Sequence, residues 1–428
     1  MDLYAYRRGV LHCEGVPLQK IADAVGTPTY VYSLGTVLGH YRRLAEAFAD
    51  TDCQIYYSVK ANSSLALLAA LAQAGAGFDI VSAGELYRVR RAGGVMAKTV
   101  FAGVGKTDAE IASAVKAGIQ MFNMESWPEA ERLNAIARRL GKRVRADFRI
   151  NPDVDAHTHA HITTGRSENK FGVPIAEAPA VYDRARKLSH LDLVGVHLHI
   201  GSQITDVAPY QAAIRKTLAL VKTLRSRGHD MRTFDLGGGM GIIYDRERPR
   251  TAREFAKAIL PLLRGQGLKL LLEPGRFIVG NAGVLLTHVV YVKPAARKTF
   301  VIVDAGMNDL IRPTLYGAYH AIVPLREREA KGAKRKIDVV GPICESGDFL
   351  AKDRLMTLPS VGRCLAVRSV GAYGFVMSSN YNSRGRAAEV LVDGKQWHVI
   401  RRRESYADLV RGETVPPAAA GRGRGRRG

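Results

Sequence analysis

The sequence predicts an α/β protein with two domains, a (β/α)8 barrel of the TIM type and a mostly β C-terminal domain. Two observations predict them. From residue 54, eight short apolar runs rich in β-branched and aromatic residues alternate with longer segments whose apolar residues recur every three or four positions. Eight strands alternating with helices over about 230 residues is typical of such a barrel. From about residue 282, strand-like runs follow one another with few helices between them.

The elements of the barrel follow each other in a regular order. Its strands are expected at 54–59, 77–82, 99–104, 119–124, 143–150, 191–200, 232–239 and 269–274. Helices are expected between them at 64–74, 83–92, 108–117, 128–141, 176–189, 209–227 and 252–265. An open doubly wound sheet is the alternative, but the count of eight and the absence of an early GxGxxG turn favour a closed barrel.

The second domain begins where helices become rare. Its strands are expected at 283–292, 299–303, 337–340, 389–392 and 396–400. The strand-like segment Tyr30-Val31-Tyr32 has no place in the barrel count and is expected to join this domain. The domain bounds that follow are 36–281 for the barrel, 1–35 with 282–415 for the β domain, and 416–428 for a disordered Gly/Arg tail.

Composition indicates a soluble protein of the cytoplasm. A chain of 428 residues with 46% hydrophobic and 24% charged residues can bury a large core. Four cysteines are widely spaced and form no CxxC pair, which argues against a disulfide framework or a zinc ribbon. We expect no metal site. The N-terminus lacks the apolar segment of a signal peptide, and no apolar stretch reaches the roughly 18 residues of a membrane span.

The formal net charge of +23 is spread along the chain, apart from four arginines in the terminal Gly-Arg repeat. A solvated basic surface is the simplest interpretation, and such a field also attracts anionic substrates and cofactors. Binding of RNA through the basic charge and the tail is an alternative. No nucleic-acid motif accompanies the charge, so this alternative is not favoured.

Lys60 ends the first strand-like run. A lone ammonium at the end of a buried strand is costly unless it is used. A partly desolvated lysine loses its proton more easily and can form a Schiff base, so Lys60 is a candidate for covalent chemistry. The alternative is a lysine that merely extends to the surface. Other polar residues also stand in or after barrel strands, where barrel enzymes place their chemistry: Asp79, Arg149, His197, His199 and Glu273.

Two glycine-rich turns follow the seventh and eighth strands. Gly237, Gly238 and Gly239 let backbone amides approach an anion, and Gly275-Arg276 adds donors from the neighbouring strand. Loops after these strands form the usual phosphate site of such barrels. A lysine across the rim from a phosphate site suggests pyridoxal 5′-phosphate (PLP). In that interpretation Glu273 lies near the pyridine nitrogen and keeps it protonated, while His199 stacks on the ring.

From about residue 5 to 410 the chain resembles diaminopimelate decarboxylases of the alanine racemase-like PLP fold, and ten segments, in order, carry the resemblance. They are YSVKAN (57–62), GAGFDIVSAGEL (75–86), NPDVDAHTH (151–159), ENKFG (168–172), HIGSQI (199–204), DLGGGMG (235–241), EPGR (273–276), DAGMNDLIRPTLYGAYH (304–320), GPICESGDFLAKDR (341–354) and GAYGFVMSSNYNSR (371–384). The resemblance implies decarboxylation of meso-2,6-diaminopimelate to L-lysine and carbon dioxide, the last step of lysine biosynthesis.

The resemblance also implies residue roles. Lys60 carries the cofactor, and the other cofactor contacts are Asp79, Arg149, His199, Ser202, Gly237, Gly238, Gly239, Glu273, Gly275, Arg276 and Tyr373. The substrate contacts are Arg276, Arg312, Tyr316, Glu345 and Tyr373, with Glu345 at the distal ammonium and Arg276, Arg312 and Tyr316 at the distal carboxylate. Cys344 protonates the carbanion and reaches the site from the partner subunit of a homodimer whose active sites are shared.

The two C-terminal cysteines differ in their surroundings. Cys344 stands in a loop between polar residues and is expected to be reactive, whereas Cys364 lies in an apolar run and is expected in the core. His197 and Gly385 depart from the residues common in the family, and neither is expected to touch the chemistry. Decarboxylases of ornithine, arginine or carboxynorspermidine are the alternative on the same fold. An amino-acid racemase is a weaker alternative, since Cys344-Glu345 resembles the decarboxylase pattern. A catalytically inactive regulator is weaker as well, since Lys60 and Cys344 are both present.

Overall fold

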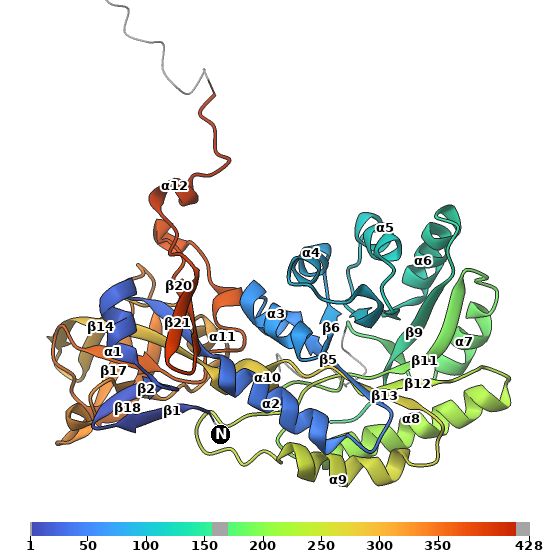
Figure 1. Cartoon of the computed structure of the whole chain (residues 1–428), viewed down its shortest axis with the longest axis horizontal. Coiled ribbons are helices and arrows are strands. Elements are labelled where there is room, and N and C mark those ends of the chain that lie inside the picture. Colours follow the sequence, from blue (N-terminus) through green and yellow to red (C-terminus); the bar gives the residue numbers. More distant parts are fainter. Residues whose placement is uncertain (1, 156–169, 417–428) are drawn as a thin grey trace, which may run out of the picture.

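The computed structural model describes residues 2–155 and 170–416. The chain forms two lobes, a barrel with its helices and a β-rich domain beside it (Figure 1). The barrel strands pair in parallel, and the ring closes between its last and first strands: β5 (Cys53–Ser58), β6 (Gly77–Ile80), β7 (Thr99–Phe101), β8 (Met121–Met124), β9 (Val144–Asn151), β11 (Leu191–His197), β12 (Thr233–Asp235) and β13 (Lys269–Leu272). The short β10 (Val173–Pro174) pairs outside the ring with β9. The predicted (β/α)8 barrel is confirmed.

Helices cover the outside of the barrel. They are α2 (Leu34–Ala47), α3 (Leu65–Gln73), α4 (Ala83–Arg91), α5 (Asp108–Ala117), α6 (Trp127–Arg139), α7 (Ala178–Ala185), α8 (Ala208–Ser226), α9 (Ala252–Leu263) and the short α10 (Arg276–Val279). Local sequence sets several helix starts. Thr107 and Thr251 each form a capping box with a glutamate three residues later, which satisfies backbone donors of the first turn.

Alternation along each strand separates the core from the barrel interior. On β9, Ala146, Phe148 and Ile150 are buried in the main hydrophobic core, and the Phe148 ring packs edge-on against Tyr182 of α7 at 5.3 Å. Asp147 and Arg149 point the other way, into the barrel, because successive strand side chains face opposite sides. On β9 the apolar side chains are therefore buried under the helices, and two charged side chains point into the barrel.

The β domain contains β4 (Thr29–Ser33), β14 (Gly283–Pro294), β15 (Thr299–Val303), β16 (Ile322–Pro324), β17 (Lys334–Val340), β18 (Phe349–Thr357), β19 (Cys364–Val367), β20 (Ala388–Asp393) and β21 (Gln396–Arg401). The N-terminal strand β4 pairs with β14 and β20, as expected for Tyr30-Val31-Tyr32. A small sheet and short helices complete the chain: β1 (Tyr4–Arg7), β2 (Val10–Cys13), β3 (Val16–Pro17), α1 (Leu18–Val25), α11 (Arg312–Tyr316) and α12 (Tyr406–Leu409). The exact domain bounds stay a prediction.

Several short strands were not expected from the sequence. The largest is β18, which lies at the edge of its sheet. Its charged run Lys352-Asp353-Arg354 hides the strand pattern, because one side of an edge strand meets water. Six barrel strands also end earlier than expected, and β7, β11 and β12 end earlier by three or four residues.

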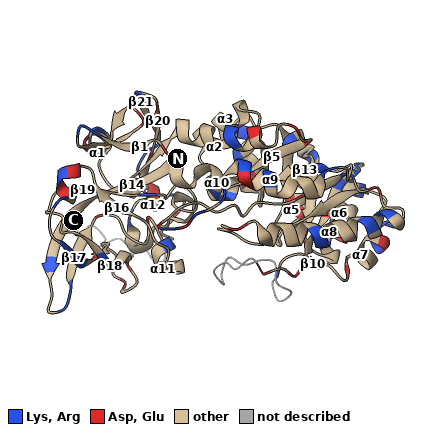
Figure 2. Ribbon diagram, turned by 90° about the horizontal axis from the view of Figure 1, so that it is seen from below, with Lys and Arg blue, Asp and Glu red and all other residues tan. Residues whose placement is uncertain are grey.

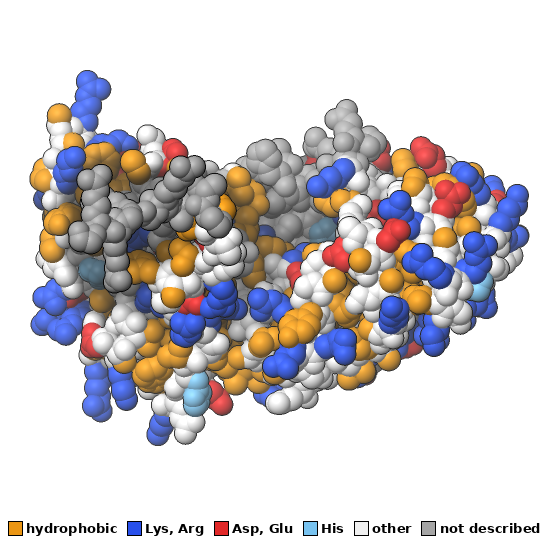
Figure 3. Space-filling view, turned by 90° about the horizontal axis from the view of Figure 1, so that it is seen from above, with side chains coloured by type: hydrophobic (Ala, Val, Ile, Leu, Met, Phe, Trp, Pro, Cys, Tyr) orange, Lys and Arg blue, Asp and Glu red, His pale blue; other side chains and the backbone are white. Residues whose placement is uncertain are grey.

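Lys and Arg residues are found on both lobes (Figure 2, Figure 3). This distribution agrees with a solvated basic surface. Of the predicted tail, residues 417–428 lie outside the described residues, as do residues 156–159 and 168–169 of two of the matching segments. Within the described residues, none of the helices has the length and apolarity needed to cross a membrane.

Candidate active site

A cavity of about 310 Å³ lies at the C-terminal ends of the barrel strands and is closed on one side by the β domain. It brings together six of the predicted site residues: His199, Ser202, Arg276, Arg312, Tyr316 and Tyr373. Five further residues line it that were not expected there: Gln203, Tyr244, Glu247, Ala318 and Tyr319. The barrel and the second domain thus both contribute walls.

Lys60 lies in a 3₁₀ turn (Val59–Ala61) directly after β5 and forms an ion pair with Asp79 of the adjacent β6. Ser58 Oγ donates to the same carboxylate oxygen at 2.7 Å. Burial lowers the pKa of Lys60, but the charges of Asp79 and Glu273 outweigh it, so the pKa lies above its ordinary value. The expectation that burial alone would make Lys60 lose its proton easily is therefore wrong: the carboxylates favour the ammonium.

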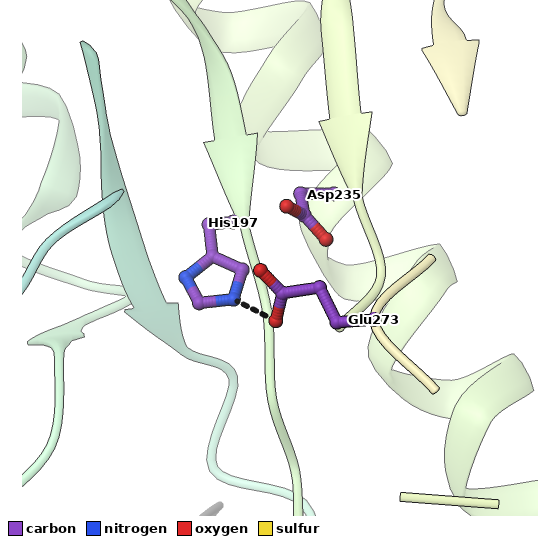
Figure 4. A group of neighbouring side chains, drawn as sticks. All are labelled: His197, Asp235 and Glu273. Atoms are coloured by element: carbon purple, nitrogen blue, oxygen red, sulfur yellow. Dashed lines mark hydrogen bonds and ion pairs between the residues drawn. The ribbon is translucent and has the colours of Figure 1, made fainter. Parts of the chain in front are cut away.

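His197 pairs with Glu273 inside the barrel (Figure 4). Its Nε2 lies 3.2 Å from Glu273 Oε2, and both side chains are almost fully buried. Burial disfavours both charges, but each charge stabilises the other: the pKa of His197 rises to about 9 and that of Glu273 falls to about 2. His197 was not expected to touch the chemistry, but it contacts Glu273, the predicted partner of the cofactor nitrogen, and favours the ionised form of that carboxylate.

Two further carboxylates lie beside this pair. One side-chain nitrogen of His197 and one carboxylate oxygen each of Asp235 and Glu273 lie within 4.8 Å of one another. Asn123 Nδ2 lies 3.1 Å from Glu273 Oε1 and 3.4 Å from Asp235 Oδ2. Burial raises the pKa of Asp147 to about 7 and that of Asp235 well above its usual range. Glu273 is therefore the carboxylate of this group whose ionised form is favoured most.

The His197–Glu273 pair predicts a pH-dependent stability. A histidine whose pKa is raised on folding stabilises the protein fully below pH 6.5 and loses that contribution as the pH rises through about 9. We expect His197→Gln to lower the free energy of unfolding by on the order of 3 kcal/mol at pH 6. The gap to the native protein should shrink toward pH 9, as measured by denaturant unfolding. His398→Gln, at an exposed position on β21, is the control, and a pH-independent gap would contradict the prediction.

His199 and Arg149 are held close together. Arg149 Nη2 donates to the His199 carbonyl at 3.1 Å, and Nη1 donates to Glu125 at 3.1 Å. The Gly238 amide donates to His199 Nδ1 at 3.3 Å. Burial, and then the charges of Arg149 and Lys60, hold the pKa of His199 well below its usual range. The ring is therefore neutral, which suits stacking against an aromatic ligand.

The glycine turn after β12 is tightly packed. A Cβ at Gly237, Gly238 or Gly239 would lie 2.2–2.4 Å from a backbone oxygen, so no other residue fits this turn. The Gly237 amide donates to Asp235 and the Gly238 amide to His199. Among the described residues, the Gly239 amide is the one amide of this turn without an acceptor, and it is the donor we expect to meet a phosphate.

The remaining cofactor contacts come from two sides. Gly275 packs against the turn that carries Lys60, since a Cβ there would lie 2.9 Å from Ala61 Cβ. The amide of Tyr373, from the second domain, donates to the Ala61 carbonyl at 2.8 Å. Arg276 Nη2 donates to Ser202 Oγ at 3.1 Å. The β domain is thus tied directly to the backbone beside Lys60.

Comparison with known proteins decides the family. The family model "Pyridoxal-dependent decarboxylase, pyridoxal binding domain" matches residues 34–280. The diaminopimelate decarboxylase of Pseudomonas aeruginosa is 54% identical over 97% of this chain and 100% of that protein. The chain belongs to the diaminopimelate decarboxylase family.

Solved structures agree with this assignment. The diaminopimelate decarboxylase of Helicobacter pylori, complexed with L-lysine, superposes with a TM-score of 0.88 at 41% identity, covering 92% of this chain and 98% of that one. The enzyme from M. jannaschii, in co-complex with L-lysine, gives a TM-score of 0.92 at 37% identity, covering 98% and 99%. The resemblance stated from the sequence motifs is thereby confirmed.

Members of this family use PLP, and the residues present fit it. The packed glycine turn, the neutral His199 ring, the ionised Glu273 and the partly exposed Lys60 lie at one end of the barrel. Asp79 Oδ1 is buried without a hydrogen-bond partner among the described residues. These features make a site for a phosphorylated pyridine aldehyde, with Lys60 as the amine that can hold it covalently.

Ten predicted site residues are not among those that line the cavity: Lys60, Asp79, Arg149, Gly237, Gly238, Gly239, Glu273, Gly275, Cys344 and Glu345. Two of these ten, Cys344 and Glu345, lie at the surface of the chain. Cys344 is exposed and its amide donates to Asn382 Oδ1 at 2.7 Å. Glu345 is exposed as well, and its carboxylate accepts from the Gly347 amide at 3.2 Å. Cys364, expected in the core, is partly buried in β19, and burial raises the pKa of its thiol. A single chain therefore lacks the predicted acid at the cavity.

Proposed function

We propose that this chain removes carbon dioxide from meso-2,6-diaminopimelate and releases L-lysine, with PLP as cofactor. The observation that carries the substrate is the pair Arg276 and Arg312. Both side chains are buried at the cavity, and among the described residues neither forms an ion pair. Buried guanidinium groups without a carboxylate partner favour a ligand that brings one. Diaminopimelate has a second amino-acid centre that supplies it.

The residues of the chain divide the work. When bound, PLP supplies an electron-accepting ring for the electron pair left by the departing carboxylate. Lys60 is the amine that would hold the cofactor, and Glu273, kept ionised by His197, would pair with its ring nitrogen. His199 offers a neutral face for stacking. The glycine turn, Ser202 and the backbone of Gly275 and Arg276 receive the phosphate. The other cofactor contacts are Asp79, Arg149 and Tyr373.

The reaction breaks one carbon–carbon bond and adds one proton to the carbon that loses carbon dioxide. Arg276, Arg312 and Tyr316 receive the distal carboxylate and Glu345 the distal ammonium, so the other end of the substrate is presented to the cofactor. We assign the proton to Cys344. Cys344 and Glu345 are exposed and do not line the cavity of their own chain, so we propose a homodimer in which each subunit supplies these residues to the active site of the other. We place this dimer in the cytoplasm.

A substrate panel tests the proposal. Release of carbon dioxide is measured with PLP and, in turn, meso-diaminopimelate, ornithine, arginine and carboxynorspermidine. We expect kcat/KM for meso-diaminopimelate to exceed that for ornithine by at least about 10²-fold, because ornithine leaves Arg276 and Arg312 unpaired. Faster turnover of ornithine would overturn the assigned substrate and favour the alternative on the same fold.

A further inference from the structure

Tyr244 lines the cavity from the loop that joins β12 to α9. The side chain is buried, and its position is fixed at both ends. The Glu247 carboxylate accepts from the Tyr244 amide at 2.9 Å, and the Tyr244 ring meets the His320 ring edge-on at 5.3 Å. His320 is itself buried, and its Nδ1 lies 2.9 Å from the Arg368 carbonyl. A rigid phenol is thus presented to the cavity.

The Tyr244 hydroxyl is the meeting point of two guanidinium groups. Arg312 Nη1, from the first residue of α11, donates to it at 2.7 Å. Arg276 Nη1, from the first residue of α10, hydrogen-bonds to the same oxygen. Both guanidinium carbons also lie over the Tyr244 ring, at 4.7 Å for Arg312 and 5.7 Å for Arg276. One arginine belongs to the barrel and the other to the second domain, so this oxygen joins the two walls of the cavity.

The buried guanidinium groups of Arg276 and Arg312 repel each other, so a group that binds both is needed to hold them side by side. Burial lowers the pKa of Arg312, and the charge of Arg276 adds to this effect, whereas Tyr244 opposes it. A phenol oxygen has two lone pairs and can accept from both groups at once. The shared oxygen therefore sets the spacing of the two arginines. Their Nε atoms have no hydrogen-bond partner among the described residues.

We propose that Tyr244 is a positioning residue that holds Arg276 and Arg312 at a fixed spacing and thereby prepares the cavity for a ligand carboxylate. This inference rests on the proposed function and names a further determinant of its substrate choice. Without the hydroxyl, the two guanidinium groups repel each other with no shared acceptor between them. Part of the binding free energy of a carboxylate ligand would then be used to bring the two guanidinium groups together. The affinity of a ligand without a carboxylate would not change.

Two amines separate this role from a general structural one. L-lysine retains the amino-acid centre that is not decarboxylated, and cadaverine is the same chain without a carboxylate. Binding of both to the PLP-loaded enzyme is measured by calorimetry. We expect Tyr244→Phe to weaken L-lysine binding about 10- to 100-fold and cadaverine binding less than about threefold. Tyr6→Phe is the matched control, since its hydroxyl donates to the Pro324 carbonyl away from the cavity.

Kinetics give a second measurement. In Tyr244→Phe the KM for meso-diaminopimelate should rise about tenfold while kcat changes less than about threefold. In an Arg312→Gln background the same substitution should cost much less, because only one guanidinium group is left to hold. Additive losses in this double-mutant cycle would overturn the proposal. If Tyr244→Phe does not fold, Tyr244→His is used instead, because histidine keeps one hydrogen-bond acceptor. Its binding of L-lysine and of cadaverine is then compared in the same way.

The outcomes distinguish this inference from the proposed function. If meso-diaminopimelate remains the preferred substrate but L-lysine binds Tyr244→Phe as tightly as the native enzyme, only the role of Tyr244 is overturned. Equal loss of L-lysine and cadaverine overturns it as well, because a collapsed cavity would affect both ligands. If the native enzyme binds the two amines equally, the carboxylate site itself and the role of Tyr244 within it are both overturned.

Discussion

Lys60→Ala should abolish covalent attachment of PLP and lower turnover of meso-diaminopimelate by roughly 10³-fold or more. Lys60 is the proposed amine for the cofactor, and its position is set by the turn after β5 and by the ion pair with Asp79. Borohydride reduction of the loaded enzyme, followed by mass spectrometry of its peptides, locates the attachment. We expect the added mass on the peptide that contains Lys60 and its loss in the variant.

Lys98→Ala is the matched control for this experiment. Lys98 also lies in a 3₁₀ turn, at the start of β7, but it is exposed. Its removal should change neither the attachment nor the turnover. Persistence of the visible absorbance band of covalently held PLP in Lys60→Ala would contradict the role of Lys60. So would the added mass on any other lysine of the native enzyme.

The order of the barrel could be predicted because its signals are local. A short segment of sequence is enough to recognise the periodicity of a strand or helix. The same is true of the glycine turns after β12 and β13. Lys60, Glu273 and the glycine turn all follow or end barrel strands in the sequence. Their position at one rim of the barrel could therefore be predicted without knowledge of their contacts. The edge strand β18 was missed because its exposed side carries charges that break the expected pattern.

The contacts of His197 and Tyr244 could not be predicted in this way. His197 meets Glu273 from a strand 76 positions away in the sequence, and Tyr244 meets Arg312 across 68 positions. No local pattern encodes such pairs, because they arise from the closure of the barrel and from the docking of the second domain. The position of His197 near the end of an expected barrel strand was the available signal for the first. For Tyr244 the sequence offered only its position soon after the glycine turn.

The pKa of Lys60 shows why a single physical argument is not enough. Desolvation alone predicts a lysine that gives up its proton, and it remains the largest single effect on this group. The structure adds Asp79 and Glu273, which reverse the direction. An account of Lys60 as a nucleophile must therefore include the neutralisation of those carboxylates, and the ring nitrogen that we propose faces Glu273 supplies one such partner.

Cys344→Ala should lower turnover by about 10²- to 10⁴-fold while PLP stays bound, because a positioned general acid contributes that much. Cys344 is exposed on its own chain and does not line the cavity there, so its effect depends on a second subunit. The visible absorbance of the cofactor and the rate of carbon dioxide release separate the two quantities. Cys364→Ala, which removes a partly buried thiol from β19, is the control and should leave both unchanged.

Mixing two inactive variants tests where Cys344 acts. If each site takes Lys60 from one subunit and Cys344 from the other, a mixed dimer of Lys60→Ala and Cys344→Ala has one site with both changes and one with neither. Random reassociation of equal amounts should then restore about a quarter of the native activity, since half of the dimers are mixed and each has one intact site. Lys60→Ala mixed with His199→Ala should restore nothing, because both residues belong to the barrel of the same chain. Failure of the first mixture to recover activity, with mixed dimers demonstrated by mass, would place the acid within one chain. A different group at the cavity would then have to protonate the product.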